Sequence, residues 1–464
     1  MRPRARLAVV RTGEVGFWWR SLGGPPAPRA PLDHPLEADV AIVGAGYTGL
    51  WSAYYLKRAE PSLRIVMLER EFAGFGASGR NGGWVSGFFS GPPRVYERSG
   101  DYAALQRAMF ATVDELGSVL GEQRIDADFR KGGHLGVALG HAQLQRVRSE
   151  VRQAGVHGLA REDLHELSAA ELAARVRVAG ALGASFSPHL ARVHPAKLLR
   201  GLASAVTALG VSIYEQTPVS EIRPREALTP AGPVRARWVL RATEGYTCGL
   251  KGLERALVPM NSSMIVTEPL SEETWREIGW SGAEVLSDSA NVYVYLQRTG
   301  DGRIAIGGRG VPYRFGSRTD GAGQTAPSTI ASLTEKLHEM FPATAGVPID
   351  HAWSGVLGVP RDWCMSVAAD PATGLAWAGG YVGEGVAAAN LAGRTLRDLI
   401  LGRRSELTAL PWVGRAPARW EPEPLRWAAI QAVYALYRRA DRDERRAGRL
   451  SRLGRLVDRA SGRH

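Results

Sequence analysis

The sequence predicts an α/β fold in which a Rossmann-like nucleotide-binding domain is interrupted by an α+β domain built on a mainly antiparallel sheet. The first indication is the stretch from Asp39 to Gly83, where a strand, a glycine-rich turn, a helix and a second strand follow in order. The second is a glycine turn ahead of a small-residue helix from Val386 to Leu396. The third is a group of alternating strands between Ala290 and Gly308. At 464 residues the chain exceeds one ordinary core, so two domains are expected.

The nucleotide-binding unit begins with Val40 to Val43, an apolar run without alternation that predicts a parallel strand buried on both faces. Glycines at the GxGxxG spacing come next. Gly44 permits a tight turn, Gly46 lets the backbone approach a pyrophosphate, and Gly49 lets the helix pack closely on the strand. Since the N–H groups at a helix start favour negative charge, we expect phosphates beside Gly44, Gly46, Tyr47, Thr48 and Gly49. A glycine-rich turn that binds nothing is the alternative.

The second strand of this unit, Arg64 to Leu68, ends at an acidic residue. Glu69 follows Gly49 by twenty residues, where a carboxylate can accept a hydrogen bond from a ribose hydroxyl. An acidic side chain disfavours a 2′-phosphate, which leaves NAD or FAD. The chain then stays glycine-rich from Gly74 to Gly83 and does not return to a helix, which suits close approach by a large flat group. The sequence therefore favours FAD.

Several separated motifs carry a family resemblance. They are DVAIVGAGYTGL, LER, GASGRNGGW, HPAKLLRGL, ATEGY and GGYVGEGVAAANLAGR. This set resembles the FAD-dependent amine and amino-acid oxidases of the D-amino-acid-oxidase superfamily, and above all the gamma-glutamylputrescine oxidase type, over residues 16 to 404. The resemblance implies that adenine meets the backbone of Val219. It also implies cofactor contacts from Glu69, Arg70, Ala77, Ser78, Arg80, Asn81, Gly82, Gly83, Val219, Ala242, Thr243, Gly245, Gly380, Tyr381, Gly383, Glu384, Gly385 and Val386.

The resemblance further implies how the flavin is held. Relatives with covalent flavin use a His in the loop after the second strand or a Cys before the final strand. Here the loop Ala77 to Gly83 has no His, and Cys364 lies several residues beyond the expected place, so we expect non-covalent FAD. The turn Gly379 to Gly385 would bring a helix N-terminus to the N1–C2=O edge of reduced flavin, where it stabilises negative charge. A purely structural turn is the alternative.

We expect four regions. They are an N-terminal arm over 1–37, an FAD-binding domain from 38–115, 190–255 and 345–404, a substrate domain from 116–189 and 256–344, and a basic helical tail over 405–464. In the arm, Trp18 and Trp19 are expected to anchor the segment by burial and not to contact substrate. His194 precedes a helix, so we expect it to cap or pack and not to act as a base.

The substrate sheet supplies the candidate catalytic residues. Tyr293, Tyr295 and Gln297 alternate with apolar residues, and Thr299 to Gly302 predicts a hairpin turn. The resemblance implies that this sheet covers the flavin, which makes Tyr293, Tyr295 and Arg303 pocket candidates; a solvated polar face is the alternative. Many relatives carry a Lys near flavin N5 on the strand that bears Arg303. Arginine stays protonated, so it can stabilise charge but cannot shuttle a proton.

Composition excludes several classes of protein. The net charge is +12, but no nucleic-acid-binding signature accompanies it, and the tail from 405 to 464 contributes thirteen arginines against seven acidic residues. This tail can form a basic amphipathic helix that meets an anionic membrane or a partner, but we favour docking on its own body or disorder. Two cysteines give neither a disulfide framework nor metal-ligand spacing.

The apolar start of the chain ends at Arg11, so we expect an unexported, cytoplasmic protein without a transmembrane span.

The expected reaction is oxidation of a small amine or amino acid. A neutral amine loses hydride from its α-carbon to flavin N5, the imine hydrolyses in water, and oxygen reoxidises the flavin to give hydrogen peroxide. One alternative is a flavin dehydrogenase that passes electrons to a carrier. Another is a non-catalytic flavin-binding module that uses its basic tail on membrane or nucleic acid.

Overall fold

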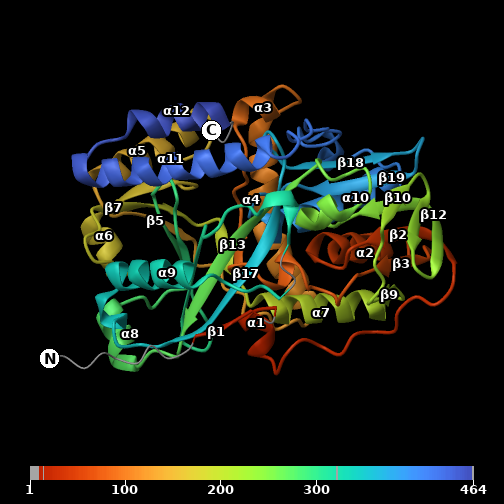
Figure 1. The fold of residues 1–464 in the computed structure, drawn as a ribbon, viewed down its shortest axis with the longest axis horizontal. Helices are drawn as coiled ribbons and strands as arrows, with labels where there is room; N and C mark the ends of the chain where they lie inside the picture. The colour runs from red at the N-terminus through yellow and green to blue at the C-terminus, as the bar shows by residue number, and fades with distance from the viewer. Residues whose placement is uncertain (1–9, 14, 320–321, 462–464) are drawn as a thin grey trace.

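The computed structural model describes residues 10–13, 15–319 and 322–461 (Figure 1). Most of the apolar, signal-like start lies outside these residues. The described strands form an eight-stranded sheet, a nine-stranded sheet and a two-stranded ribbon. Within the same ranges, no helix is long and apolar enough to cross a membrane. The predicted α/β fold with a second, mainly antiparallel sheet is confirmed.

The first sheet is the nucleotide-binding unit expected from the GxGxxG turn. Its order is β10-β11-β12-β2-β3-β9, and β19 and β18 continue from β12. Its strands are β2 (Leu36–Val43), β3 (Ile65–Leu68), β9 (Ser212–Tyr214), β10 (Glu221–Arg223), β11 (Glu226–Thr229), β12 (Gly232–Arg241), β18 (Ser366–Asp370) and β19 (Leu375–Gly379). β2 pairs in parallel with β3 and β12, and β12 pairs in parallel with β19. Val40, Ala41 and Ile42 are fully buried, as an apolar strand covered on both faces requires.

Helices pack against this sheet and against each other. They are α2 (Tyr47–Ala59), α3 (Pro93–Glu97), α4 (Tyr102–Glu122), α7 (Pro195–Ala208) and α10 (Gly385–Ile400). The small residues of α10 let it approach α2 closely, since a Cβ on Gly393 would lie 2.7 Å from the backbone carbon of Trp51. Both helices begin beside the carboxyl ends of the parallel strands.

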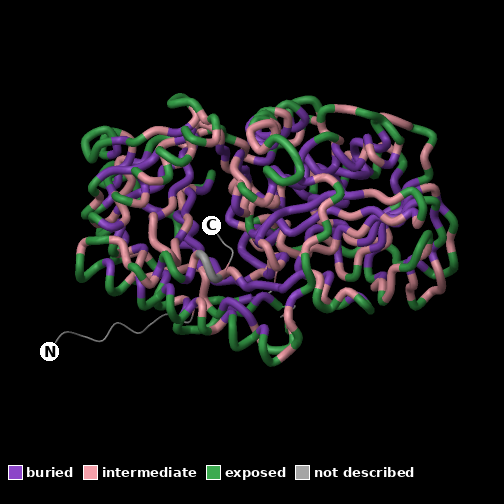
Figure 2. Tube along the Cα trace, turned by 90° about the horizontal axis from the view of Figure 1, so that it is seen from above, coloured by how far each residue is buried: buried purple, intermediate pink, exposed green. Residues whose placement is uncertain are grey.

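The second sheet has the order β1-β17-β13-β16-β15-β14-β5-β7-β6. Its strands are β1 (Arg11–Thr12), β5 (His134–Ala138), β6 (His165–Ser168), β7 (Gly183–Ser187), β13 (Val258–Thr267), β14 (Val285–Asp288), β15 (Tyr295–Arg298), β16 (Ile304–Gly308) and β17 (Ile349–Val359). Around it lie α5 (His141–Val156), α6 (Ala169–Ala173), α8 (Glu272–Ile278) and α9 (Pro327–Met340). The ribbon joins β4 (Trp84–Ser86) to β8 (Leu190–Arg192). Buried segments concentrate inside both sheet regions (Figure 2).

One expected boundary is wrong. We placed the return to the FAD-binding domain at residue 345, but β17 pairs antiparallel with β13 from Val258↔Val359 onward and so belongs to the second sheet. The chain rejoins the first sheet only at Ser366, where β18 begins. A buried apolar strand does not reveal from its own sequence which sheet it will join, because that depends on the partner's register.

The N-terminal arm is anchored by α1 (Phe17–Arg20), whose three aromatic side chains are buried. Trp18 lies against Trp353 and His194, and its Nε1 donates to the backbone oxygen of Asn81. His194 caps α7, because its Nδ1 accepts from the N–H of Lys197. Burial lowers the pKa of His194 to about 4, which keeps the ring neutral and able to accept. The expected anchoring and capping roles are confirmed.

The C-terminal tail docks on the body as two helices, α11 (Leu425–Ala447) and α12 (Arg452–Ser461), along the upper edge of Figure 1. Glu444 of α11 pairs with Arg146 of α5 at 2.8 Å. Asp441 accepts from the backbone N–H groups of Asn291 and Val292. Of the arrangements considered for this tail, the described residues adopt docking on the body.

Candidate functional site

A pocket lies where the carboxyl ends of the parallel strands face the second sheet, and it encloses about 1100 Å³ of empty space, part of it open to solvent. Its lining brings together several segments that are far apart in the sequence. The predicted site residues in the lining are Tyr47, Thr48, Ala77, Ser78, Arg80, Asn81, Gly82, Tyr293, Tyr295, Tyr381, Gly383, Glu384, Gly385 and Val386.

Other predicted residues lie outside this lining. They are Gly44, Gly46, Gly49, Glu69, Arg70, Gly83, Val219, Ala242, Thr243, Gly245, Gly380 and Arg303. Val219 packs on the apolar cluster of the first sheet, and the guanidinium of Arg70 lies 5.4 Å from the ring centre of Tyr246. Apart from Arg303, these residues belong to the segments that carry the pocket or to the first sheet below it.

The first glycine turn has no room for side chains. A Cβ on Gly44, which has φ +103°, would lie 2.6 Å from the backbone oxygen of Ala242. A Cβ on Gly49 would lie 2.1 Å from the oxygen of Gly44, so close helix–strand contact requires glycine there. Gly46 is the N-cap of α2 and makes no side-chain cap. The turn therefore presents backbone and a helix N-terminus to the pocket, as anion binding requires.

Glu69 supports this turn directly. Its two carboxylate oxygens accept from the N–H of Ala45 at 2.8 Å and from the N–H of Glu71 at 3.0 Å. Burial raises the pKa of Glu69, and the two N–H groups oppose that shift. Sequence reasoning gave Glu69 a role at a ribose, but it did not reveal these bonds to the turn.

The loop after β3 is held against both domains. The Asn81 side chain donates to the oxygen of Ser78 and accepts from the N–H of Gly83 at 2.7 Å. A Cβ on Gly82 would lie 2.7 Å from the ring of Tyr295, so this backbone passes directly against the second sheet. Arg80 donates through Nε to the oxygen of Phe75 at 2.9 Å. These contacts hold the loop between the N-terminus of α2, where phosphates are expected, and the second sheet.

The aromatic face of the second sheet covers the pocket. Tyr295 shares a hydrogen bond with Ser262 at 2.8 Å, and Gln297 donates to the oxygen of Gly82 at 2.6 Å. Val294 and Leu296 point the other way, into the apolar core. The predicted alternation is confirmed. Trp84, which sequence reasoning missed, also lines the pocket and packs edge-on against Tyr295.

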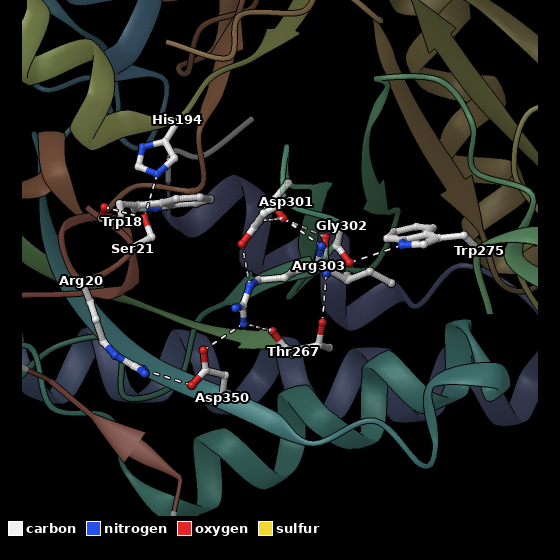
Figure 3. Close-up of polar contacts among 12 residues, drawn as sticks. Trp18, Arg20, Ser21, His194, Thr267, Trp275, Asp301, Gly302, Arg303 and Asp350 are labelled. Carbon is white, nitrogen blue, oxygen red and sulfur yellow. Dashed lines mark hydrogen bonds and ion pairs between the residues drawn. The ribbon is translucent and has the colours of Figure 1, made fainter. Parts of the chain in front are cut away.

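Arg303 is not where we expected it. Its Nη1 lies 2.9 Å from Asp350 and 3.0 Å from the backbone oxygen of Thr267, and its Nε lies 2.7 Å from Asp301 (Figure 3). The residue stands just before β16, whereas the pocket is lined from the far end of that strand, at Gly308 and beyond. The expected hairpin turn is correct, but it places Arg303 at the wrong end of the strand.

Arg309 occupies the pocket from this strand instead. Its Nη1 is buried and has no hydrogen-bond partner among the described residues. Glu384, at the start of α10, lines the same pocket, and burial raises its pKa to about 7 against an opposing effect of Ser86 and Arg309. The pocket lining thus holds Arg309, whose Nη1 is buried, together with Glu384, a carboxyl of near-neutral pKa. The only sequence signal for Arg309 is its place directly after a buried strand.

Glu244 is a second carboxyl that sequence reasoning passed over, although it lies within the ATEGY motif. It begins the short helix η2 (Glu244–Gly249) and lines the pocket. Its Oε1 accepts from the N–H of Tyr381 at 3.0 Å, while Oε2 has no partner within the described part of the chain. Burial raises the pKa of Glu244 to about 7.

These features fit a flavin dinucleotide. The glycine turn at α2 leaves room only for a ligand that approaches the backbone, and both α2 and α10 begin at the pocket without a side-chain cap. The broad face between them is covered by Tyr295 and Trp84, which suits a flat aromatic group.

Comparison with known proteins also indicates a flavin-binding protein. The sequence profile of the family described as FAD dependent oxidoreductase matches residues 39–399. The chain is 32% identical over 393 residues to the gamma-glutamylputrescine oxidoreductase of Escherichia coli K12, covering 81% of this chain and 86% of that one. It is 22% identical to the glycine oxidase of Bacillus subtilis, covering 79% of this chain and 93% of that one.

Solved structures share the fold. The L-proline dehydrogenase from P. horikoshii has a TM-score of 0.66 at 17% identity and covers 82% of this chain and 98% of its own. The L-amino acid deaminase from Proteus myxofaciens has a TM-score of 0.67 at 15% identity and covers 84% of this chain and 95% of its own. With the family profile spanning most of the sequence, the chain belongs to the FAD dependent oxidoreductase family of the D-amino-acid-oxidase superfamily.

Proposed function

We propose that this enzyme oxidises the C–N bond of a small amine that carries a carboxylate, such as an amino acid, and releases an imine that hydrolyses in water. Bound FAD supplies the hydride acceptor, and oxygen or another acceptor then regenerates it. The protein binds the substrate, orients its α-carbon and excludes water from the covered face. Relatives named for gamma-glutamylputrescine and for glycine support substrates of this class.

The observation that carries this proposal is the state of Arg309. A guanidinium nitrogen that is buried without a hydrogen-bond partner is unfavourable, because the desolvated N–H groups gain no compensating contact. A substrate carboxylate placed against its planar fork would supply that contact. Tyr295, hydrogen-bonded to Ser262, would then hold one side of the substrate, and Trp84 would limit access of water.

Glu384 complements Arg309 at the other pole of the substrate. Its carboxyl has a pKa of about 7, so it can stand opposite an ammonium group when ionised or donate a hydrogen bond when neutral. An amino acid presents both an anionic and a cationic group, which matches a pocket lined by arginines and by carboxyls. A simple monoamine would leave Nη1 of Arg309 without a partner.

Non-covalent binding of FAD is supported by the side chains around the pocket. Among the described residues its lining contains neither His nor Cys, which are the side chains that would carry a covalent link. Cys364 is buried, and a Cβ on Gly91 would lie 2.5 Å from its sulfur. Protein precipitated with acid is expected to release yellow FAD into the supernatant; colour kept in the pellet would contradict the non-covalent link.

Reoxidation by an electron carrier is a second candidate, favoured by the position of Arg303. The residue that we expected to assist oxygen is held by Asp301 and Asp350 outside the pocket. The pocket lining retains Arg80 and Arg309 as cations. Rapid reoxidation of the reduced enzyme in air, with one hydrogen peroxide formed per turnover, supports the oxidase; slow reoxidation that an artificial acceptor accelerates supports the dehydrogenase.

The decisive experiment is an anaerobic screen in which matched pairs of compounds are mixed with the holoenzyme and bleaching of the flavin band is recorded. Each pair consists of an amino acid and the amine that lacks its carboxylate. Bleaching by the carboxylate-bearing members at lower concentration is the expected result. Bleaching by the amines alone would overturn the assigned substrate class, and the absence of bleaching by any amine or amino acid would overturn the proposed activity.

A further inference from the structure

The first half of α11 has an unusual outer face. A helix on a protein surface normally turns polar side chains to water and an apolar stripe to the core. Residues 425 to 437 read LRWAAIQAVYALY, and the inward stripe of this stretch consists of Arg426, Ile430, Tyr434 and Tyr437, all buried. What remains for the outside is apolar: Leu425, Trp427, Ala428, Ala429, Ala432, Ala435 and Leu436 are exposed.

The exposure of these side chains is substantial. Leu425 is 64% exposed, Trp427 39% and Leu436 38%. Within this fully described stretch, the polar side chains are the buried Arg426 and tyrosines and Gln431, which donates to the backbone oxygen of Tyr313 at 2.9 Å. The outer face of residues 425–436 therefore carries no charge.

A neighbouring loop extends the apolar surface. Phe315 packs edge-on against Trp427 with ring centres 6.3 Å apart, and a shallow groove runs between them, lined also by Val311 and Arg318. Val311 is 44% exposed and Phe315 47%. Of the eight large apolar side chains that are exposed among the described residues, six lie on this loop, α11 or α12. We call the exposed face of residues 425–436 together with Val311 and Phe315 the α11 patch.

The same stripe of α11 becomes basic one turn further on. Leu425, Ala429, Ala432 and Leu436 are followed at helical spacing by Arg439, Arg442 and Arg446, all exposed. In this half of the helix, in α12 and in the link between them, the exposed arginines are Arg438, Arg439, Arg442, Arg445, Arg446, Arg449, Arg452 and Arg455. Among them the described ion pairs include Arg439 with Asp443 at 3.9 Å, which is too long and too exposed to neutralise the surface.

We propose that the α11 patch and its arginine stripe form a docking surface for an anionic lipid bilayer. The apolar half would enter the boundary between headgroups and acyl chains, where Trp and Leu are favoured, and the arginines would meet the negative headgroups alongside. Charge complementarity selects this occupant. A second copy of the chain would bring the same net charge of +12 against this surface, whereas an anionic bilayer neutralises it.

The α11 patch and the lining of the pocket include residues that are near neighbours in the sequence. Arg309 lines the pocket, and Val311 of the α11 patch follows two residues later on the same loop. Docking would thus bring the flavin-bearing side of the second sheet to the bilayer without inserting a helix across it. The proposal does not depend on the substrate assigned above.

The test is co-sedimentation of the full-length holoenzyme with vesicles of phosphatidylcholine alone and of phosphatidylcholine mixed with phosphatidylglycerol. Binding to the anionic vesicles is expected, together with weak or no binding to the neutral ones and a loss of binding as salt rises. The double variant Leu425→Glu/Leu436→Glu should bind the anionic vesicles about tenfold more weakly or worse, because it places charges where the headgroup boundary would lie. The matched control is Val156→Glu, which alters an apolar side chain 78% exposed at the end of α5.

Each outcome bears on the proposal. Wild-type protein that stays in the supernatant with anionic vesicles overturns it, and so does binding that survives Leu425→Glu/Leu436→Glu. A wild-type dimer in light scattering that becomes a monomer in the double variant would assign the α11 patch to a second copy and also overturn it. Flavin content and thermal unfolding of the variants show whether they are folded, and Ala432→Glu, at another exposed position of the same face, replaces the double variant if that protein is unstable.

Discussion

Arg303 and Asp350 form an ion pair in which Nη1 of the arginine lies 2.9 Å from Oδ2 of the aspartate. The other oxygen of Asp350 lies 3.1 Å from Nη1 of Arg20 in the N-terminal arm, so one carboxylate joins the arm to the start of β16 (Figure 3). The guanidinium of Arg303 also lies 5.2 Å from the ring centre of Phe17. The pair is therefore part of the anchor of α1 and is separate from the pocket.

Arg303→Met should lower stability and leave catalysis intact. The side chains of Arg303 and Asp350 are 17% and 16% exposed, so loss of the arginine leaves a largely buried carboxylate with one partner fewer, at a cost of about 1–3 kcal/mol. Urea unfolding measures this cost, and stopped-flow absorbance measures flavin reduction and reoxidation separately. Arg200→Met, on the exposed side of α7, is the control. If flavin reoxidation is slower in Arg303→Met but not in Arg200→Met, the charge of Arg303 does assist reoxidation of the flavin.

Gly46→Val should abolish FAD binding. A Cβ at this position would already lie 2.8 Å from Oγ of Ser78, and a branched side chain would fill the space next to the N-terminus of α2 where the phosphates are expected. The flavin absorbance of the purified protein and its reconstitution with added FAD measure the effect. Gly121→Val is the control, since a Cβ there meets nothing within 4 Å. Full FAD occupancy in Gly46→Val would mean that the phosphates bind elsewhere.

The parts of the fold that were predicted correctly depend on local sequence. One short motif contains Gly44, Gly46 and Gly49. Its spacing alone predicts which glycine faces a strand and which faces a ligand. The alternation that turns Tyr295 to the pocket and Leu296 to the core is likewise set by the period of a strand. Such features need no knowledge of distant residues.

The parts that were missed depend on tertiary partners. Arg303 and Arg309 lie at opposite ends of one short strand, and only the pairing of β16 with β13 and β15 decides which end borders the pocket. The same is true of β17, whose sheet is fixed by its register with β13. Glu244 belongs to a recognised motif, but its environment comes from Tyr381, far along the chain. No local period could have shown these neighbours.

The contribution of Glu244 to the stability of the protein should fall as pH rises from about 4.5 to about 7. Burial raises the pKa of this carboxyl from its ordinary 4.5 to about 7. In that window the folded state keeps a proton that the unfolded state has released, and this difference makes folding less favourable with every step in pH. Glu244→Gln removes the titration and should flatten the slope of the free energy of unfolding. The exposed Glu272→Gln should leave the slope unchanged; an identical slope in Glu244→Gln would place the titration on another group, such as Glu384.

Arg309→Leu should weaken the binding of carboxylates. If the buried Nη1 of Arg309 receives the substrate carboxylate, its removal costs about 1.5–3 kcal/mol, or roughly tenfold or more in affinity. The measurement is an anaerobic titration with a simple carboxylate that carries no amine, followed through the change that it causes in the flavin spectrum. Binding of amines without a carboxylate should change little, because they make no use of this cation.

Two further variants make the result specific. Arg309→Lys keeps the charge but loses the planar fork, so it should recover part of the affinity and not all of it. Arg318→Leu, on the loop outside the pocket, removes an exposed arginine of the same region and should leave carboxylate affinity as in the wild type. A loss that is equal in Arg309→Leu and Arg318→Leu would reflect the overall field of the basic surface. If only Arg309→Leu loses affinity, and only for carboxylates, then Arg309 contacts the carboxylate directly. A long-range electrostatic effect would weaken carboxylate binding in both Arg309→Leu and Arg318→Leu.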